Sequence, residues 1–199
     1  IYITGYNYNY SDWNTNGVIN DRRNYDAFIR KYFPDGTKGW TSFLGSSLDD
    51  YGNAITTGSD GSIYIAGYTF GDLDDETNNG SLDTFISKFK TDGTKVWTSL
   101  LGSPYSDFGT ALTTGLDGSI YITGMTGGDL DGHTNNGFND AFISKYSTNG
   151  TKDWTRLLGS SFYANANGIT TGSDGSLYIT GMTEGDLDGQ TLSLIHISE

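Results

Sequence analysis

The feature that most constrains the fold of this chain is an internal repeat. A short phrase (an aliphatic residue, Tyr, Ile, a small residue and Gly) begins at Ile1, Ile63, Ile120 and Leu177, so successive copies are 62, 57 and 57 residues apart. Between the phrases the same landmarks return in the same order: an Asp-x-Phe-Ile segment, then a Trp, then an ending in Leu-Gly. Such a repeat is one supersecondary unit that buries its apolar surface only by stacking on its neighbours.

Each repeat contains four short segments typical of β-strands, rich in β-branched and aromatic residues and bounded by Gly, Asn and Asp. In one complete repeat they cover residues 110–114, 120–124, 140–146 and 152–157. Asp117-Gly118 joins the first two and Asn149-Gly150 the last two, and these dipeptides supply the positive φ of tight hairpin turns. The sequence therefore predicts an all-β fold, a partial β-propeller of four-stranded antiparallel blades with about 57 residues per repeat. The alternative is a stacked β-solenoid, whose repeats are shorter and lack two tight hairpins each.

The repeat also divides the chain into units. We expect a partial blade and loop at 1–52, complete blades at 53–109 and 110–167, a partial blade at 168–191, and a tail at 192–199. Because closed propellers have at least four blades, we expect an open arc whose remaining blades belong to a longer chain. The tail leaves the repeat abruptly and matches the translation of a common sequencing-adapter end, so we expect it to be an artefact.

Several of these motifs resemble a known family. The segments 117–124 (Asp-Gly-Ser-Ile-Tyr-Ile-Thr-Gly), 128–131 (Gly-Asp-Leu-Asp), 140–146 (Asp-Ala-Phe-Ile-Ser-Lys-Tyr) and the Trp-containing strand that ends in Leu-Leu-Gly are similar to the SBBP family of bacterial β-propeller repeats. The resemblance implies extracellular or cell-surface proteins, often with several domains, and no established catalytic residues. The stretch 92–97 (Asp-Gly-Thr-Lys-Val-Trp) is also similar to the Trp motif of quinoprotein propellers, over a shorter length.

Composition narrows the range of partners. Eleven Lys and Arg residues against 24 Asp and Glu residues give a net charge of −13, which opposes binding to nucleic acids and to anionic membrane surfaces, since both present negative charge. No apolar run approaches the roughly 18 residues that a membrane-spanning helix needs, so we expect no membrane insertion. With no cysteine, disulfides and thiolate metal sites are excluded. Proteins, carbohydrates and cations remain.

Antiparallel strand order predicts two different faces of the arc. The tight hairpins lie on one, the hairpin face, and the longer connections lie on the other, the long-loop face. Basic residues flank the hairpins and acidic residues gather in the long loops, so we expect the long-loop face to be strongly negative. Binding residues usually lie on such loops. The ligand-contact candidates there are Tyr51, Tyr105 and Tyr163, and the alternative is that their rings cover neighbouring blades.

Alternating carboxylates in two of the long loops predict a calcium site. Their positions are Asp129, Asp131 and Asp140 in one loop and Asp72, Asp74 and Asp83 in the other. These offsets are similar to those of a calcium loop, in which hard oxygen ligands alternate. Neither loop has the central Gly or the closing Glu of that motif, whereas residues 12–17 have the Gly but no closing acid. The alternative is a set of Asx turns in a Gly- and Asn-rich loop.

Recurring aromatic residues have a structural interpretation. One Trp and one Phe return at a fixed phase in each repeat, at Trp40, Trp97 and Trp154 and at Phe28, Phe85 and Phe142. Because they recur in register with the strands, we expect them to form the core between blades.

Repetition argues against catalysis, since an active site is normally one asymmetric group of residues. His133 is replaced by Glu76 in the matching loop, and no Ser-His-Asp set can be assembled around it. We therefore expect no enzyme but a propeller scaffold of a bacterial surface or secreted protein, which binds a protein, a glycan or a cation through the long-loop face. The alternatives are part of a quinoprotein-like or glycan-active propeller enzyme, and an architectural spacer.

Overall fold

The computed structural model describes residues 1–8, 24–187, 189 and 190, and its regular structure is entirely β. The first sheet contains β1 (Tyr2–Tyr8), β2 (Tyr25–Tyr32) and β3 (Lys38–Leu44). The second contains β4 (Asp50–Thr57), β5 (Ile63–Thr69), β6 (Asp83–Phe89) and β7 (Lys95–Leu101). The third contains β8 (Asp107–Thr114), β9 (Ile120–Thr126), β10 (Asp140–Tyr146) and β11 (Lys152–Leu158). The fourth pairs β12 (Ala164–Thr171) with β13 (Leu177–Thr183).

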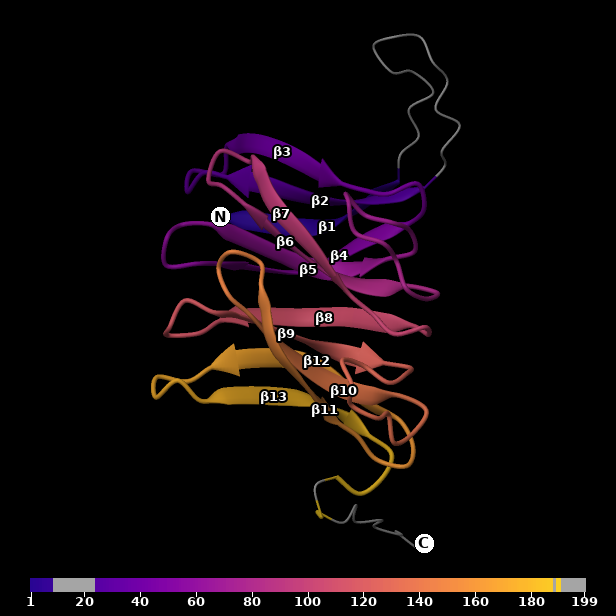
Figure 1. Cartoon of the computed structure of the whole chain (residues 1–199). Coiled ribbons are helices and arrows are strands. Elements are labelled where there is room, and N and C mark those ends of the chain that lie inside the picture. Colours follow the sequence, from indigo (N-terminus) through magenta and orange to yellow (C-terminus); the bar gives the residue numbers. More distant parts are fainter. Residues whose placement is uncertain (9–23, 188, 191–199) are drawn as a thin grey trace, which may run out of the picture.

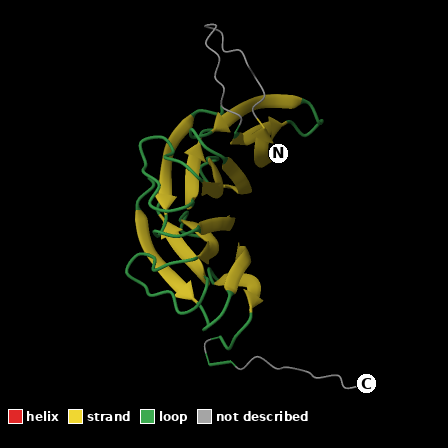
Figure 2. Cartoon of the chain, turned by 90° about the vertical axis from the view of Figure 1, so that its right-hand side faces the viewer, coloured by secondary structure: helices red, strands yellow, loops and turns green. Residues whose placement is uncertain are grey.

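The sheets follow one another along an open arc (Figures 1 and 2). Within each sheet the strands are antiparallel and adjacent in sequence order. Strands β1, β4, β8 and β12 contact one another in turn and link successive sheets. The predicted all-β fold, a partial propeller of four-stranded antiparallel blades, is confirmed. In the described part of the chain no helix is long and apolar enough to cross a membrane.

A β-bulge at the same place in the first strand of three blades explains the recurring Gly of the repeated phrase. The pairing shifts at Asn53 in β4, at Thr110 in β8 and at Asn167 in β12. The bulge brings the backbone of β4 so close to Gly67 that a Cβ there would overlap the Tyr51 carbonyl. The bulged side chains also join blades, because Asn53 Nδ2 donates to the Gly109 carbonyl at 2.9 Å and Thr110 Oγ1 donates to the Ala166 carbonyl at 2.6 Å.

The hydrophobic core lies between sheets. One buried cluster joins the first and second sheets and comprises Ala27, Ile29, Leu44, Ile63, Ile65, Leu73, Phe85 and Phe89. The other joins the second and third sheets and comprises Tyr64, Ala66, Ile86, Leu101, Leu112, Ile120, Ile122, Leu130, Phe142 and Tyr146. Trp40 and Trp97 are half-buried and pack against these clusters. A blade therefore completes its core only with its neighbour.

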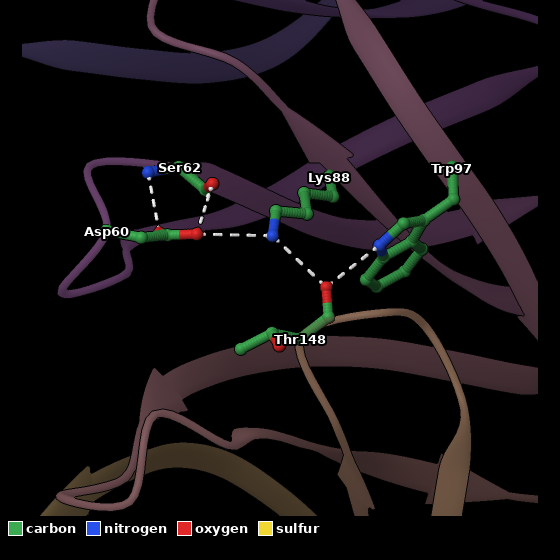
Figure 3. A network of polar contacts seen from close by, with 5 residues as sticks. All are labelled: Asp60, Ser62, Lys88, Trp97 and Thr148. Carbon is green, nitrogen blue, oxygen red and sulfur yellow. Dashed lines mark hydrogen bonds and ion pairs between the residues drawn. The ribbon is translucent and has the colours of Figure 1, made fainter.

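Two of the recurring Trp residues, Trp40 and Trp97, form a hydrogen bond with the hairpin of the next blade. Trp97 Nε1 donates to the Thr148 carbonyl at 3.2 Å, and Lys88 Nζ donates to the same carbonyl at 3.1 Å and to Asp60 at 3.3 Å (Figure 3). Gly150 of that hairpin has φ 92°, and a Cβ there would lie 2.9 Å from the Trp97 ring. The Asp-Gly-Thr-Lys-x-Trp motif thus has a structural role in the contact between blades.

Candidate functional site

The long-loop face consists of two kinds of loop, and backbone hydrogen bonds join the one kind to the other. Loops 70–82 and 127–139 join the second and third strands of a blade, and loops 102–106 and 159–163 lead into the next blade. Short parallel bridges pair Leu82 with Ser106 and Asn139 with Tyr163. The Ser81 amide donates to the Tyr105 carbonyl at 3.2 Å and the Phe138 amide to the Phe162 carbonyl at 3.2 Å. The loops of neighbouring blades therefore form one continuous surface.

The six carboxylates predicted to bind calcium are engaged in three separate ways. Those of Asp72 and Asp129 accept the backbone amides of Asn78 and Asn135, each at 2.9 Å and six residues further along the chain. Asp74 forms an ion pair with Lys95, and Asp131 forms one with Lys152, at the beginning of the last strand of each blade. Asp83 and Asp140 are fully buried, and each accepts an amide of its own loop, from Asn79 and Asn136.

A tight turn within each loop separates these carboxylates. Leu130 and His133 exchange backbone hydrogen bonds, and both residues between them have positive φ, 52° at Asp131 and 77° at Gly132, as a type I′ turn requires. Leu130 is buried between blades, as is Leu73 in the preceding blade, and this burial holds the turn against its own sheet. Among the described residues, no group of three or more His, Asp or Glu side chains lies close enough together to hold a metal ion.

Calcium binding stays a prediction, with a direct measurement. If the loops bind Ca²⁺, millimolar Ca²⁺ raises the Tm of the chain. At a Ca²⁺ concentration of 100 times the Kd, mass action adds about 2.7 kcal/mol per site to the free energy of unfolding. Replacing the carboxylates by Asp129→Ala and Asp131→Ala then abolishes the rise. A wild-type Tm that does not respond to Ca²⁺ contradicts the site. The similar loop at residues 12–17 lies outside the described residues.

Buried carboxylates recur at the junctions between blades, and the sequence analysis did not single them out as pairs. Asp50 and Asp107 begin the first strands of two blades, and both are fully buried beside an Asp of the preceding blade, Asp26 and Asp83. Burial, with a smaller contribution from the neighbouring carboxylate, raises the pKa of Asp50 and of Asp83 to about 6. One oxygen of each, Oδ1, forms no hydrogen bond. At the third junction Ala164 occupies the equivalent position.

Of the three ligand-contact candidates, Tyr51 lies in a cluster of aromatic rings at the long-loop face. Its ring stacks on that of Tyr68, with centroids 4.9 Å apart and planes at 24°. It also contacts Tyr25 at 5.5 Å and Tyr6 at 4.7 Å, and Tyr68 reaches Phe108 at 5.0 Å. We call these rings, together with Tyr8 and Phe70, the tyrosine cluster. The cluster assembles side chains from three sheets, and Tyr51 is the one of the three ligand-contact candidates that belongs to it.

The other two candidates belong to the outer rim of the same face. Tyr105 is 64% exposed, and the equivalent residues of the neighbouring blades, Leu48 and Phe162, are 51% and 50% exposed. Tyr163 stacks on Phe138, with centroids 5.1 Å apart and planes at 20°. The structure thus places Tyr105 and Tyr163 on separate loops of the rim, whereas Tyr51 lies in β4 and not in a loop as expected.

Comparison with known proteins agrees with this architecture. Residues 153–188, which run from β11 to the end of the β12–β13 hairpin and the loop beyond, match a family model described as SBBP, a β-propeller repeat. The chain carries an SBBP-type β-propeller repeat. The resemblance expected from the motifs is confirmed, and the match covers the recurring Trp strand, the Asp-Gly-Ser hairpin and the Gly-Asp-Leu-Asp loop of the SBBP-type repeat.

Two curated proteins are similar over most of the chain. One is the "Regulatory protein FlaEY" of Caulobacter vibrioides, 27% identical over 190 residues, which cover 83% of this chain and 20% of that protein. Another is the "Uncharacterized WD repeat-containing protein L264" of Acanthamoeba polyphaga mimivirus, 23% identical over 193 residues, which cover 77% of this chain and 14% of that protein. The chain therefore spans a fifth or less of the length of these relatives.

Proposed function

We propose that these SBBP-type repeats form a non-catalytic scaffold that binds a protein, a glycan or a cation through the long-loop face. The observation that supports this most is the exposed apolar residue that each blade places on the rim: Leu48, Tyr105 and Phe162. Large apolar side chains that are exposed together on one face usually mark an interaction surface. Loops on a rigid β scaffold are a common place for such surfaces.

The chemistry of the loops supports binding rather than catalysis. Asp72 and Asp129 recur in equivalent positions and are occupied by backbone amides of their own loops, so the loops are built alike in successive blades. His133 lies in the tight turn beside Asp131 and has Glu76 as its counterpart in the preceding blade. A repeated surface of this kind suits multivalent contact with a large partner.

A comparison of two triple variants tests the proposed binding surface. Wild-type chain is applied to arrays of glycans and of peptides, beside the rim variant Leu48→Ser, Tyr105→Ser, Phe162→Ser. The control changes three exposed apolar residues near the hairpins: Phe33→Ser, Val96→Ser, Leu116→Ser. We expect the arrays to show ligands that the wild type and the control variant both bind and that the rim variant no longer binds. Equal loss in both variants, or retention by both, contradicts the proposal.

We further propose that the protein acts on a bacterial surface or outside the cell, as the family resemblance suggests. The corresponding measurement uses intact cells that carry the full-length gene. Added protease is expected to cleave the propeller in intact cells, whereas cleavage that occurs only after lysis would contradict a surface location.

A further inference from the structure

We propose that the tyrosine cluster binds a cationic side chain, Arg or Lys, of a protein partner. This inference rests on the proposed function, because it names the ligand chemistry for one part of the long-loop face. It depends on three observations: the continuity of the aromatic surface, the carboxylate within it, and the placement of the chain's own cations.

The aromatic surface is continuous across three sheets. Ring contacts run from Tyr8 to Tyr25 at 5.0 Å, from Tyr25 to Tyr51 at 5.5 Å, from Tyr51 to Tyr68 at 4.9 Å and from Tyr68 to Phe108 at 5.0 Å. Tyr6 is exposed and stands edge-on to both Tyr25 and Tyr51. Tyr8 and Phe70 are exposed as well, so the cluster is open to solvent. A cation over the face of an aromatic ring is attracted by the ring quadrupole.

A carboxylate lies within the same cluster. Asp49 Oδ1 accepts the backbone amide of Tyr25 at 3.0 Å, and Asp49 Oδ2 accepts the Tyr51 hydroxyl at 3.4 Å. Burial, helped by this carboxylate, raises the pKa of the Tyr51 hydroxyl to about 12, so the phenol is neutral at physiological pH. Burial, with a smaller contribution from Asp49, also raises the pKa of Asp26. The site therefore combines aromatic faces with a negative charge.

Four of the described lysines form ion pairs with carboxylates outside the cluster. Lys88 and Lys145 pair with Asp60 and Asp117 in the hairpins, and Lys95 and Lys152 pair with Asp74 and Asp131. None of the ion pairs among the described residues includes Asp49. With a net charge of −13, the chain as a whole also attracts a basic partner.

The negative charge at the tyrosine cluster favours a cation over a neutral sugar as its ligand. Both ligands stack on tyrosine rings, but only a cation gains from the Asp49 carboxylate and from the negative charge of the whole chain. A guanidinium group suits the site particularly well, because it stacks flat on an aromatic ring and donates to a carboxylate at its edge. The observations therefore favour a basic protein segment over a carbohydrate.

The test uses a fluorescent peptide of alternating Gly and Arg, titrated with the full-length protein and followed by fluorescence anisotropy. Its matched probe is the same peptide with citrulline, which has nearly the same shape as Arg but no charge. A neutral chitin hexasaccharide is the third probe. We expect the Arg peptide to bind, to weaken with added salt, and to bind at least about tenfold more tightly than the citrulline peptide.

Variants locate the binding in the cluster. Tyr51→Leu with Tyr68→Leu keeps apolar volume but removes both rings, and is expected to raise the Kd at least about tenfold. Tyr51→Phe with Tyr68→Phe keeps the rings and is expected to stay within about twofold of wild type. The aromatic control is Tyr178→Leu, on an exposed tyrosine of β13 near the hairpins. Asp49→Asn is expected to weaken binding more than Asp174→Asn, which makes the same change of charge in a hairpin.

Several outcomes overturn the inference, and two of them need no variant. Equal affinity for the Arg and citrulline peptides excludes recognition of charge. Binding of the hexasaccharide with no binding of the Arg peptide makes the cluster a glycan site. Unchanged Arg-peptide affinity in the Leu variant places the binding elsewhere. In each of these cases the rim triple variant can still lose ligands on the arrays, so failure of this inference is distinguishable from failure of the proposed function.

Discussion

Asp50 shows how a single residue fixes the junction between two blades. Its side chain is fully buried, Oδ2 accepts the Ser46 amide at 2.6 Å, and Oδ1 forms no hydrogen bond. The neighbouring Asp26 packs against Gly45, where a Cβ would overlap its carboxylate. The Gly that ends each Leu-Gly motif therefore leaves space for the Asp of its own blade. A buried carboxylate with an unsatisfied oxygen is tolerated most easily when it is protonated.

The pH dependence of stability follows from the Asp50 carboxyl. Its pKa is raised from 3.8 to about 6 in the folded chain, so the folded state binds the proton more tightly than the unfolded state. This contribution to stability is fully present below pH 4 and is lost as the pH rises through about 6. Asp50→Asn removes the titration and keeps an acceptor for Ser46, so we expect it to raise the free energy of unfolding at pH 7.5 by about 2–3 kcal/mol. Urea denaturation between pH 4 and 8 measures both effects.

Asp92→Asn is the control for that prediction. The Asp92 carboxylate accepts the Thr94 amide in an exposed turn, which lowers its pKa, so this variant is not expected to gain stability at pH 7.5. A loss of stability in Asp50→Asn at pH 7.5, with the pH profile unchanged, contradicts the assignment.

Two hairpin glycines allow the stability cost of backbone strain to be measured apart from the cost of disturbing the contact between blades. Gly36 and Gly93 have φ of 85° and 89°, but only Gly93 faces a ring, with a Cβ expected 2.7 Å from Trp40. We expect Gly36→Ala to cost about 1–2 kcal/mol through the positive φ alone. Gly93→Ala is expected to cost about 1 kcal/mol more, because the Trp40 ring has to move. Urea denaturation gives both values, and equal losses would show that the ring contact contributes nothing.

The hairpin that joins the last two strands of a blade is also the docking element for the preceding blade. Trp40 donates to the Thr91 carbonyl at 3.0 Å, and Trp97 donates to the Thr148 carbonyl at 3.2 Å. Strand, Trp and hairpin therefore recur as one unit whose partner is always in the neighbouring blade. This arrangement explains why the Trp and the hairpin Gly keep the same phase in every repeat.

Trp97→Phe tests this element. The variant removes the indole hydrogen bond and part of the packing on Gly150, and we expect a loss of about 1–2 kcal/mol. Hydrogen exchange of the 147–151 hairpin is expected to accelerate, because it loses a contact from the second sheet. Trp154→Phe is the matched control, since the described part of the chain has no following hairpin for Trp154 to contact. Equal effects of the two variants would contradict docking through the hairpin.

The whole molecule is an arc whose two end sheets present apolar surface. Ile3 and Phe43 are exposed on the first sheet, and Tyr178 and Met182 are exposed on the last. Interior sheets bury the equivalent surface against a neighbour, as the two core clusters show. Figure 2 shows the open arc. Each end sheet therefore exposes the kind of apolar surface that the interior sheets bury at their junctions.

We expect the isolated 199-residue polypeptide to self-associate through these end sheets. Exposed apolar sheet surfaces and strand edges are templates for association. Size-exclusion chromatography with light scattering is expected to show oligomers or aggregates, and Phe43→Lys to reduce them more than Phe33→Lys, which lies in a hairpin. A stable monomer of 21.5 kDa with cooperative unfolding would contradict this expectation.

Local patterns in the sequence determined the strands, the hairpins and the sequential antiparallel order. The predicted segment 140–146 coincides with β10, because alternation and turn residues act over a few neighbouring positions. The segment expected at 110–114 is the end of β8, which begins at Asp107 because pairing with β9 extends beyond the bulge. The family resemblance was likewise readable from local motifs.

Only the tertiary structure decided which side chains meet across blades. Even within one blade, the Asp131–Lys152 ion pair joins residues 21 positions apart, and the alternating carboxylates alone suggested a metal loop instead. The Asp131-Gly132 dipeptide was the available signal for a tight turn there. The tyrosine cluster and the pairing of Asp50 with Asp26 join residues of different blades. A two-residue periodicity fixes the side of a strand on which a residue lies, but the contacts across a junction depend on how the sheets twist and stack.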